Sequence, residues 1–257
     1  MNDRGAGSAG PQNGGAGSAG PQNGGAGSAG PQNGGAGSAG PQNGGFAAHG
    51  AKKLDYWWTV LAVDPVALPL VRVLARRRWL TPDQVSLISL VIGVAVGPVF
   101  ATASRAGLIA GAVLFYLSFM FDCVDGKLAR ATGLSSPRGE LLERIGDGAR
   151  RASAGIGLTY YLWRTGENGD WLLAAAFAIL AAYFMEISGG AERGEPRGSI
   201  AQALARRRLL PNPGMPDVSA IVYVIGPLTT LVVPALWIGI VLVVIGIVRV
   251  LLRAITA

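Results

Sequence analysis

Residues 107–125 read GLIAGAVLFYLSFMFDCVD, and this stretch indicates both the kind of fold and the place of its chemistry. No charged side chain occurs from residue 107 to residue 121. An α-helix needs about 20 predominantly apolar residues to cross the hydrocarbon core of a bilayer. The stretch then ends with Asp122 and Asp125, and carboxylates within membrane helices are costly and usually functional. We therefore expect a transmembrane helix that carries a polar site at one end.

The remaining sequence repeats this pattern of apolar runs separated by short polar segments. Six transmembrane helices are expected, at residues 84–102, 107–125, 141–163, 171–187, 218–233 and 235–252. The chain is 50% hydrophobic and only 14% charged, whereas about a quarter of the residues in a soluble domain are charged. So little polar sequence cannot cover six buried helices in water, which excludes a water-soluble α/β enzyme. The expected fold class is an all-α membrane protein.

The N-terminal part has a different composition. Residues 5–44 are four copies of GAGSAGPQNG, which contain no large apolar side chain to bury. Residues 55–79 contain three tryptophans, Trp57, Trp58 and Trp79, a residue type that is enriched at the level of the lipid headgroups. The same segment contains charges that would be costly in hydrocarbon. We therefore predict an amphipathic helix that lies in the membrane interface. The expected domains are a disordered repeat tail (1–50), an interfacial juxtamembrane segment (51–80) and a six-helix transmembrane catalytic domain (81–257).

The distribution of basic residues predicts the orientation. The net charge is +7, and Lys and Arg gather before the first expected span, at 127–151, at 193–208 and near the C-terminus. In the loops expected on the opposite side of the membrane, the only basic residues are Arg105 and Arg164. The positive-inside rule then places both termini and the site on the cytoplasmic side of a cell membrane, and it accounts for Arg150 and Arg151 as well. The charge suits anionic lipid headgroups, and no nucleic-acid-binding module is recognisable.

Four carboxylates are expected to form the site. Asp122 and Asp125 lie three residues apart at the end of one helix, and Glu143 and Asp147 lie four apart at the start of the next, so each pair shares a helix face. A short loop joins the two helices, which we therefore expect to be antiparallel neighbours whose acids converge. Oxygen ligands without His or Cys favour Mg²⁺ or Mn²⁺.

The loop between the acidic pairs, residues 126–139, reads GKLARATGLSSPRG. The small residues Gly126 and Ala129 allow a flat ligand to approach the backbone. Arg130, Arg138 and Arg144 are permanent cations that can hold phosphate oxygens. Acids, small residues and arginines together indicate a site for a metal–diphosphate substrate.

These residues resemble a known signature. The order from Asp122 to Arg130 (DCVDGKLAR), followed by Gly139, Glu143 and Asp147, resembles that of the CDP-alcohol phosphatidyltransferase family of integral membrane enzymes. Residues 81–86, TPDQVS, are similar to the family's second cytoplasmic landmark. The family places an aspartate where this chain has Glu143. Glutamate keeps the charge on an arm one methylene longer, so we expect coordination to be retained.

The resemblance implies an activity and residue roles. The activity is transfer of a phosphatidyl group from CDP-diacylglycerol to an alcohol, with release of CMP, in phospholipid biosynthesis. Asp122, Asp125, Glu143 and Asp147 would hold one or two divalent ions, and Asp147 would also be the general base. The substrate-binding residues would be Thr81, Pro82, Asp83, Gln84, Gly126, Ala129, Arg130, Ser136 and Gly139. Family members are also expected to be homodimers packed through their spans.

Two points remain open in the sequence. Glu186, near the end of the fourth expected span, would repel a phosphate-bearing acceptor and therefore favours a neutral or amine-bearing alcohol. The same carboxylates would also suit an intramembrane prenyltransferase or a divalent-cation transporter. A prenyltransferase usually has two separated Asp-rich motifs, whereas the last three spans offer only Glu186 and Asp217. A transporter needs acids along a pathway, whereas here they gather at one face.

Overall fold

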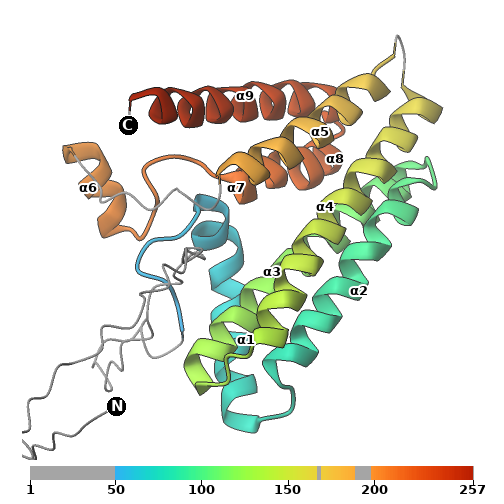
Figure 1. Ribbon diagram of the computed structural model, residues 1–257. Coiled ribbons are helices and arrows are strands. Elements are labelled where there is room, and N and C mark those ends of the chain that lie inside the picture. The colour runs from blue at the N-terminus through green and yellow to red at the C-terminus, as the bar shows by residue number, and fades with distance from the viewer. Residues whose placement is uncertain (1–49, 167–168, 189–197, 257) are drawn as a thin grey trace, which may run out of the picture. The chain divides into compact units, whose positions relative to one another are not determined.

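The computed structural model describes residues 50–166, 169–188 and 198–256, all within one compact unit, Pro41–Ala257. In these ranges the regular elements are helices (Figure 1). They are η2 (Thr59–Val63), α1 (Asp64–Arg77), α2 (Pro82–Phe100), α3 (Arg105–Thr132), α4 (Pro137–Thr165), α5 (Trp171–Ser188), α6 (Ser199–Arg206), α7 (Met215–Ala220), η3 (Ile221–Ile225), α8 (Gly226–Thr229) and α9 (Val232–Thr256). The predicted disordered tail lies outside the described residues, apart from Gly50.

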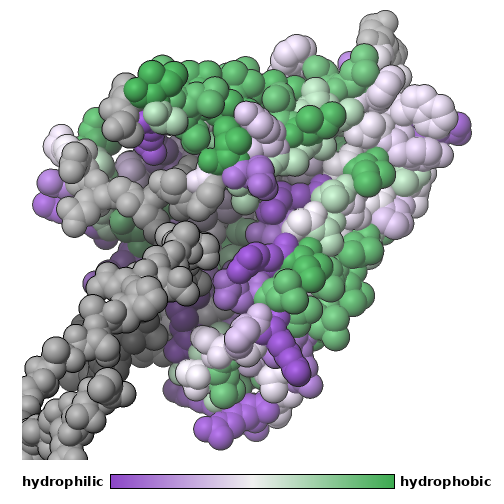
Figure 2. Space-filling model, in the orientation of Figure 1, coloured by the Kyte–Doolittle hydropathy of each residue, from purple (hydrophilic) through white to green (hydrophobic). Residues whose placement is uncertain are grey.

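Four helices are long and apolar enough to cross a membrane: α2, α3, α5 and the part of α9 from Val232 to Ile255. Figure 2 shows hydrophobic residues over much of α9, while hydrophilic residues gather at the lower ends of α2 and α4. The expected all-α membrane fold is therefore confirmed. The two other expected spans differ from these four, because α4 carries many charges and Met215–Thr229 is a shorter apolar helix.

Two expected boundaries are wrong for identifiable reasons. The span predicted to end at residue 125 continues to Thr132, because Lys127, Leu128 and Ala129 are good helix formers. It ends where Gly133 adopts the left-handed conformation, φ 70°. The span predicted at 218–233 ends earlier, at Thr229. Thr230 is left-handed, with φ 63°, and the next helix begins at Val232.

The juxtamembrane segment is helical, as expected, and packs on the bundle. Val63, Ala67, Val71 and Leu74 are buried in a cluster with residues of α2 and α3. Buried Asp64, at the start of α1, lies 3.2 Å from Lys127 Nζ and 3.0 Å from Arg208 NH1. Because these ion pairs join α1 to α3 and to the segment after α6, residues 51–80 belong structurally with the helices that follow.

Helix α2 is the common neighbour of α3 and α4. It packs extensively on both, whereas α3 and α4 contact each other along a smaller surface than the sequence suggested. Ser89 on α2 and Ser118 on α3 each donate a hydrogen bond to the other's carbonyl oxygen, at 2.8 Å. On the other side, a Cβ atom on Gly157 of α4 would lie 2.5 Å from the Cα of Gly97. Glycine at both positions therefore allows α2 and α4 to approach closely.

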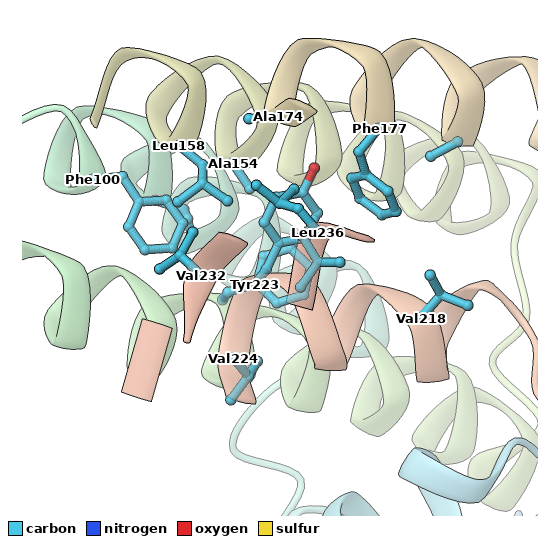
Figure 3. Close-up of a cluster of buried hydrophobic side chains, with 14 of the residues drawn as sticks. Phe100, Ala154, Leu158, Ala174, Phe177, Val218, Tyr223, Val224, Val232 and Leu236 are labelled. Atoms are coloured by element: carbon cyan, nitrogen blue, oxygen red, sulfur yellow. The ribbon is translucent and has the colours of Figure 1, made fainter. Parts of the chain in front are cut away.

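The main hydrophobic core joins α2 and α4 to the C-terminal helices. Phe100, Leu158, Phe177, Tyr223 and Leu236 belong to one buried cluster, with contributions from α2, α4, α5, η3 and α9 (Figure 3). Phe100 and Leu158 lie in the C-terminal halves of α2 and α4. The core is therefore formed away from the N-terminal ends of these two helices, where the polar residues of the predicted site are found.

Candidate active site

A pocket of about 400 Å³ lies where the N-terminal ends of α2 and α4 meet the C-terminal part of α3. It is lined by Pro82, Asp83, Ser86, Asp125, Gly126, Ala129, Arg130, Leu134, Ser135, Ser136, Pro137, Gly139, Glu140 and Glu143. Most of the predicted substrate-binding residues thus meet in one place, together with two of the four acids. The N-terminus of a helix favours bound anions, and two such termini border this pocket.

A serine connects the two helix N-termini. Ser136 precedes α4, and its hydroxyl accepts a hydrogen bond from the Gly139 backbone N–H at 2.9 Å. The same hydroxyl donates to Asp83 Oδ1, near the start of α2, at 3.1 Å. A Cβ atom on Gly139 would lie 2.9 Å from this Asp83 oxygen, so a residue without a side chain fits best. Asp83, Ser136 and Gly139 therefore fix the spacing of α2 and α4 at the pocket wall.

Two residues predicted to bind substrate lie outside the pocket lining. The Thr81 hydroxyl accepts a hydrogen bond from the Gln84 backbone N–H at 3.3 Å, and the Gln84 side chain accepts one from the Thr81 N–H at 2.9 Å. This reciprocal arrangement is a capping box, which satisfies backbone N–H groups at the start of a helix. In this structure Thr81 and Gln84 start α2 and thereby position Pro82 and Asp83.

Arg130 contacts the chain on the opposite side of the pocket. Its Nε donates a hydrogen bond to the backbone oxygen of Gly50, at 2.7 Å. Gly50 has φ 69°, in the left-handed region that favours glycine, and it packs directly against the backbone of Lys127. The residue predicted to hold phosphate oxygens therefore lines the pocket with its guanidinium fixed by the segment before α1.

Asp125 supplies the buried carboxylate of the pocket. Ser86 Oγ donates a hydrogen bond to Asp125 Oδ2 at 2.5 Å. The other oxygen, Oδ1, is buried and has no hydrogen-bond partner in the part of the chain that the structure describes. An unsatisfied buried carboxylate oxygen is unfavourable unless a cation or donor reaches it. With Glu143 also lining this pocket, Asp125 Oδ1 fits a bound divalent cation.

Asp122 and Asp147 lie around a buried arginine. Arg150 is only 2% exposed and forms an ion pair with Asp147 Oδ1, and its NH2 lies 3.7 Å from Asp122 Oδ2. Arg151 approaches the other Asp147 oxygen at 3.2 Å. The positive-inside rule assigned Arg150 no role beyond its charge, whereas the structure shows that its side chain is buried in the protein. Its position three residues after Asp147, on the same helix face, is the sequence signal that was missed.

The four acids are thus divided into two pairs. Within residues 50–166, 169–188 and 198–256, no three His, Cys, Asp or Glu side chains lie together in a geometry that would hold a metal ion. Asp125 and Glu143 line the 400 Å³ pocket, while Asp122 and Asp147 contact Arg150. Asp122 remains within electrostatic range of the other three acids. The predicted convergence of all four carboxylates on shared ions is not seen in this arrangement.

Asp147 lines a second, smaller cavity. Its volume is about 140 Å³, and it is lined by Tyr56, Trp58, Phe115, Phe119, Asp147, Arg150, Arg151, Met185, Met215, Pro216 and Ser219. These residues come from the segment before η2 and from α3, α4, α5 and α7. Asp147 therefore borders a cavity other than the pocket that contains Asp125.

The chain is similar to several characterised proteins. Over 114 residues it is 30% identical to cholinephosphotransferase 1 of Gallus gallus, a match that covers 41% of this chain and 34% of that protein. The chain therefore spans about a third of the length of this relative.

The solved structures of phosphatidylinositol phosphate synthase from Mycobacterium tuberculosis are similar in fold. The form with CDP-DAG bound has a TM-score of 0.55 and 20% identity, covering 73% of this chain and 92% of that one. The form in complex with manganese and citrate has a TM-score of 0.50 and 20% identity, covering 72% and 87%. At this identity the likeness shows a shared fold.

The sequence model of CDP-alcohol phosphatidyltransferases matches residues 79–245, which include all of α2 to α8, the 400 Å³ pocket and the four acids. This match extends over more than half of the chain and bears out the resemblance seen in the signature. The chain belongs to the CDP-alcohol phosphatidyltransferase family of integral membrane proteins.

Proposed function

We propose that the chain transfers a phosphatidyl group from CDP-diacylglycerol to an alcohol acceptor and releases CMP, in phospholipid biosynthesis. The observation that carries this proposal is the 400 Å³ pocket, which Gly126 and Arg130 of the signature line together with Asp125, whose buried Oδ1 has no hydrogen-bond partner within the described residues. The family match favours this reaction over prenyl transfer and cation transport.

The donor would bind with its diphosphate at the N-terminal ends of α2 and α4. Arg130 and the two helix dipoles attract the phosphate oxygens, while Gly126 and Ala129 leave room for the nucleotide beside α3. The acyl chains remain in the bilayer. The CDP-DAG complex of the mycobacterial protein, which shares the fold, supports a donor of this class.

Mg²⁺ or Mn²⁺ fits beside Asp125 and Glu143. When bound, the cation would neutralise charge on the phosphate oxygens and orient the diphosphate for in-line displacement. The manganese complex of the mycobacterial protein supports a divalent metal. Glu143 is exposed at the pocket rim, where its longer side chain can reach inward over a range of metal positions.

The acceptor hydroxyl would lie in the 140 Å³ cavity, next to Asp147. The Asp147 carboxylate would take the hydroxyl proton as the new P–O bond forms, because a carboxylate is too weak a base to ionise an alcohol beforehand. Arg150 and Arg151 hold one oxygen each and thereby orient the group. The aromatic residues Tyr56, Trp58 and Phe119 in this cavity favour a neutral or amine-bearing acceptor, whereas Glu186 on α5 lines a separate cavity.

The proposed topology has six spans. To the four apolar helices it adds α4 and the apolar helix Met215–Thr229, which is short for a crossing. An even number of crossings places both termini on one side of the membrane, and the positive-inside rule makes that side, which the pocket also faces, the cytoplasmic one. The proposal includes a homodimer packed through the spans, where an exposed small residue such as Ala182 allows close helix contacts.

The test is a reaction with defined lipids. Purified protein in liposomes that contain CDP-diacylglycerol, with Mg²⁺ and a panel of alcohols, should release CMP in step with a new phospholipid identified by mass spectrometry. Release of diphosphate with transfer of a prenyl chain, or metal flux without any lipid substrate, would contradict the proposal and support one of the alternatives.

A further inference from the structure

Arg150 is a deeply buried cation beside the proposed active site. Its side chain is 2% exposed, while Asp122 is 12% and Asp147 is 32% exposed. A buried guanidinium is unfavourable unless anions and acceptors surround it. Here the two carboxylates supply the anions, so the burial of Arg150 and the pairing of the two acids depend on each other.

The surroundings of Arg150 hold its guanidinium in one position. NH1 donates a hydrogen bond to Ser118 Oγ on α3, at 3.3 Å. The guanidinium carbon lies 5.9 Å from the ring centre of Phe115 and 5.3 Å from that of Phe119, within the range of cation–π attraction. A residue on α4 is thus fixed by three residues of α3. A charged side chain on the protein surface would not be held in one position by so many neighbours.

We propose that Arg150 is a built-in cation that takes the place of a metal ion between Asp122 and Asp147, so that this chain needs a divalent ion only on the Asp125–Glu143 side. The inference rests on the proposed function, since it concerns the same four acids. A guanidinium between two carboxylates offsets one of their two negative charges and fills the space that a metal ion would need, and it stays in place when substrate leaves. Arg150 is therefore a positioning residue that keeps Asp147 oriented toward the acceptor cavity.

The neighbouring Arg151 provides a matched control. It also pairs with Asp147, at 3.2 Å, but its side chain is 26% exposed. Its described ion pair is with Asp147, whereas Arg150 also reaches Asp122. Removing Arg151 therefore leaves the cation between the two acids in place, while removing Arg150 leaves both acids without it.

The test counts bound metal in the full-length protein. Wild type, Arg150→Gln and Arg151→Gln are purified in detergent and titrated with Mn²⁺, with bound ions followed by electron paramagnetic resonance. We expect about one Mn²⁺ per chain in wild type and Arg151→Gln, and about two in Arg150→Gln, where the vacated acids bind a metal. Saturating Mn²⁺ should also raise the melting temperature of Arg150→Gln by roughly 5 °C more than that of wild type.

Two results would overturn the inference: about two ions already in wild type, or no gain of Mn²⁺ and no extra stabilisation in Arg150→Gln. If Arg150→Gln does not fold, the number of Mn²⁺ ions bound per wild-type chain still decides the question. Arg150→Lys, which keeps a cation at this position, should bind the same number of Mn²⁺ ions as wild type. CMP release is assayed in parallel. Its absence in wild type would refute the proposed function, whereas the metal count would still stand or fall by itself.

Discussion

Asp147 is the side chain on which the proposed proton transfer depends, because it borders the cavity assigned to the acceptor. Asp147→Asn removes the basic oxygen and should lower the rate of CMP release by about 10²- to 10⁴-fold. The measurement is CMP formation from CDP-diacylglycerol at saturating acceptor, together with thermal unfolding to confirm the fold. Asp170→Asn is the control, since Asp170 lies between α4 and α5, outside the lining of the 400 Å³ pocket and of the 140 Å³ cavity. Equal rates for Asp147→Asn and wild type would exclude Asp147 as the base.

Glu143 carries the one departure of this chain from the family signature. Because it lines the pocket with Asp125, Glu143→Gln should weaken binding of the metal and raise the Mg²⁺ concentration for half-maximal activity by roughly 10-fold or more. Glu143→Asp keeps the charge and should stay within a few-fold of wild type. A Mg²⁺ titration of CMP release separates the two variants. An unchanged Mg²⁺ requirement in Glu143→Gln would show that this residue is not a ligand.

At the scale of single residues, the signature named many of the residues that line the 400 Å³ pocket. It did not name Arg150, for a physical reason. The pocket brings together Asp125, Gly126, Arg130 and Gly139. These residues meet because the signature runs from the end of α3 to the start of α4. Arg150 was missed, because a count of positive charges on one membrane side says nothing about which side chains turn inward. Only the packing of α4 against α2 and α3 reveals its burial.

At the scale of helices, the approach of α2 and α4 depends on glycine. Gly157→Ala would place a methyl group against the backbone of Gly97, so the two helices must separate, with a loss of about 1–3 kcal/mol in the free energy of unfolding. Thermal unfolding in detergent measures this loss. Gly148→Ala is the control, because open space surrounds that position and alanine favours a helix by up to about 1 kcal/mol. Equal losses in both variants would contradict the close contact.

Hydropathy predicted which segments form long apolar helices. It predicted less well where each helix ends and which helices pack against each other. Hydropathy marked α2, α3, α5 and α9, because long apolar runs have few other stable forms. It did not show that α3 runs on to Thr132, since the residues after Asp125 are polar yet helix-compatible. The dominance of α2 as the neighbour of both α3 and α4 depends on a serine contact with α3, the next helix, and on a glycine contact with α4.

At the scale of the whole molecule, the topology predicts which loops share a side. In a Cys123→Ser background, Ser135→Cys lies between α3 and α4 and Asp170→Cys lies between α4 and α5. A thiol reagent that cannot cross membranes should label Asp170→Cys in intact cells, and Ser135→Cys only in inverted vesicles. Labelling of both from the same side would show that α4 does not cross the bilayer.

The central claim is that the pocket around Asp125 holds the diphosphate of a CDP-linked lipid for transfer. Its most direct test is the rate of CMP release from CDP-diacylglycerol in liposomes by wild type and Asp125→Asn, with and without Mg²⁺. The account predicts Mg²⁺-dependent CMP release by wild type and a loss of about 10²-fold or more in Asp125→Asn. Wild-type protein that releases no CMP with any alcohol, or Asp125→Asn that releases it at the wild-type rate, would contradict the claim.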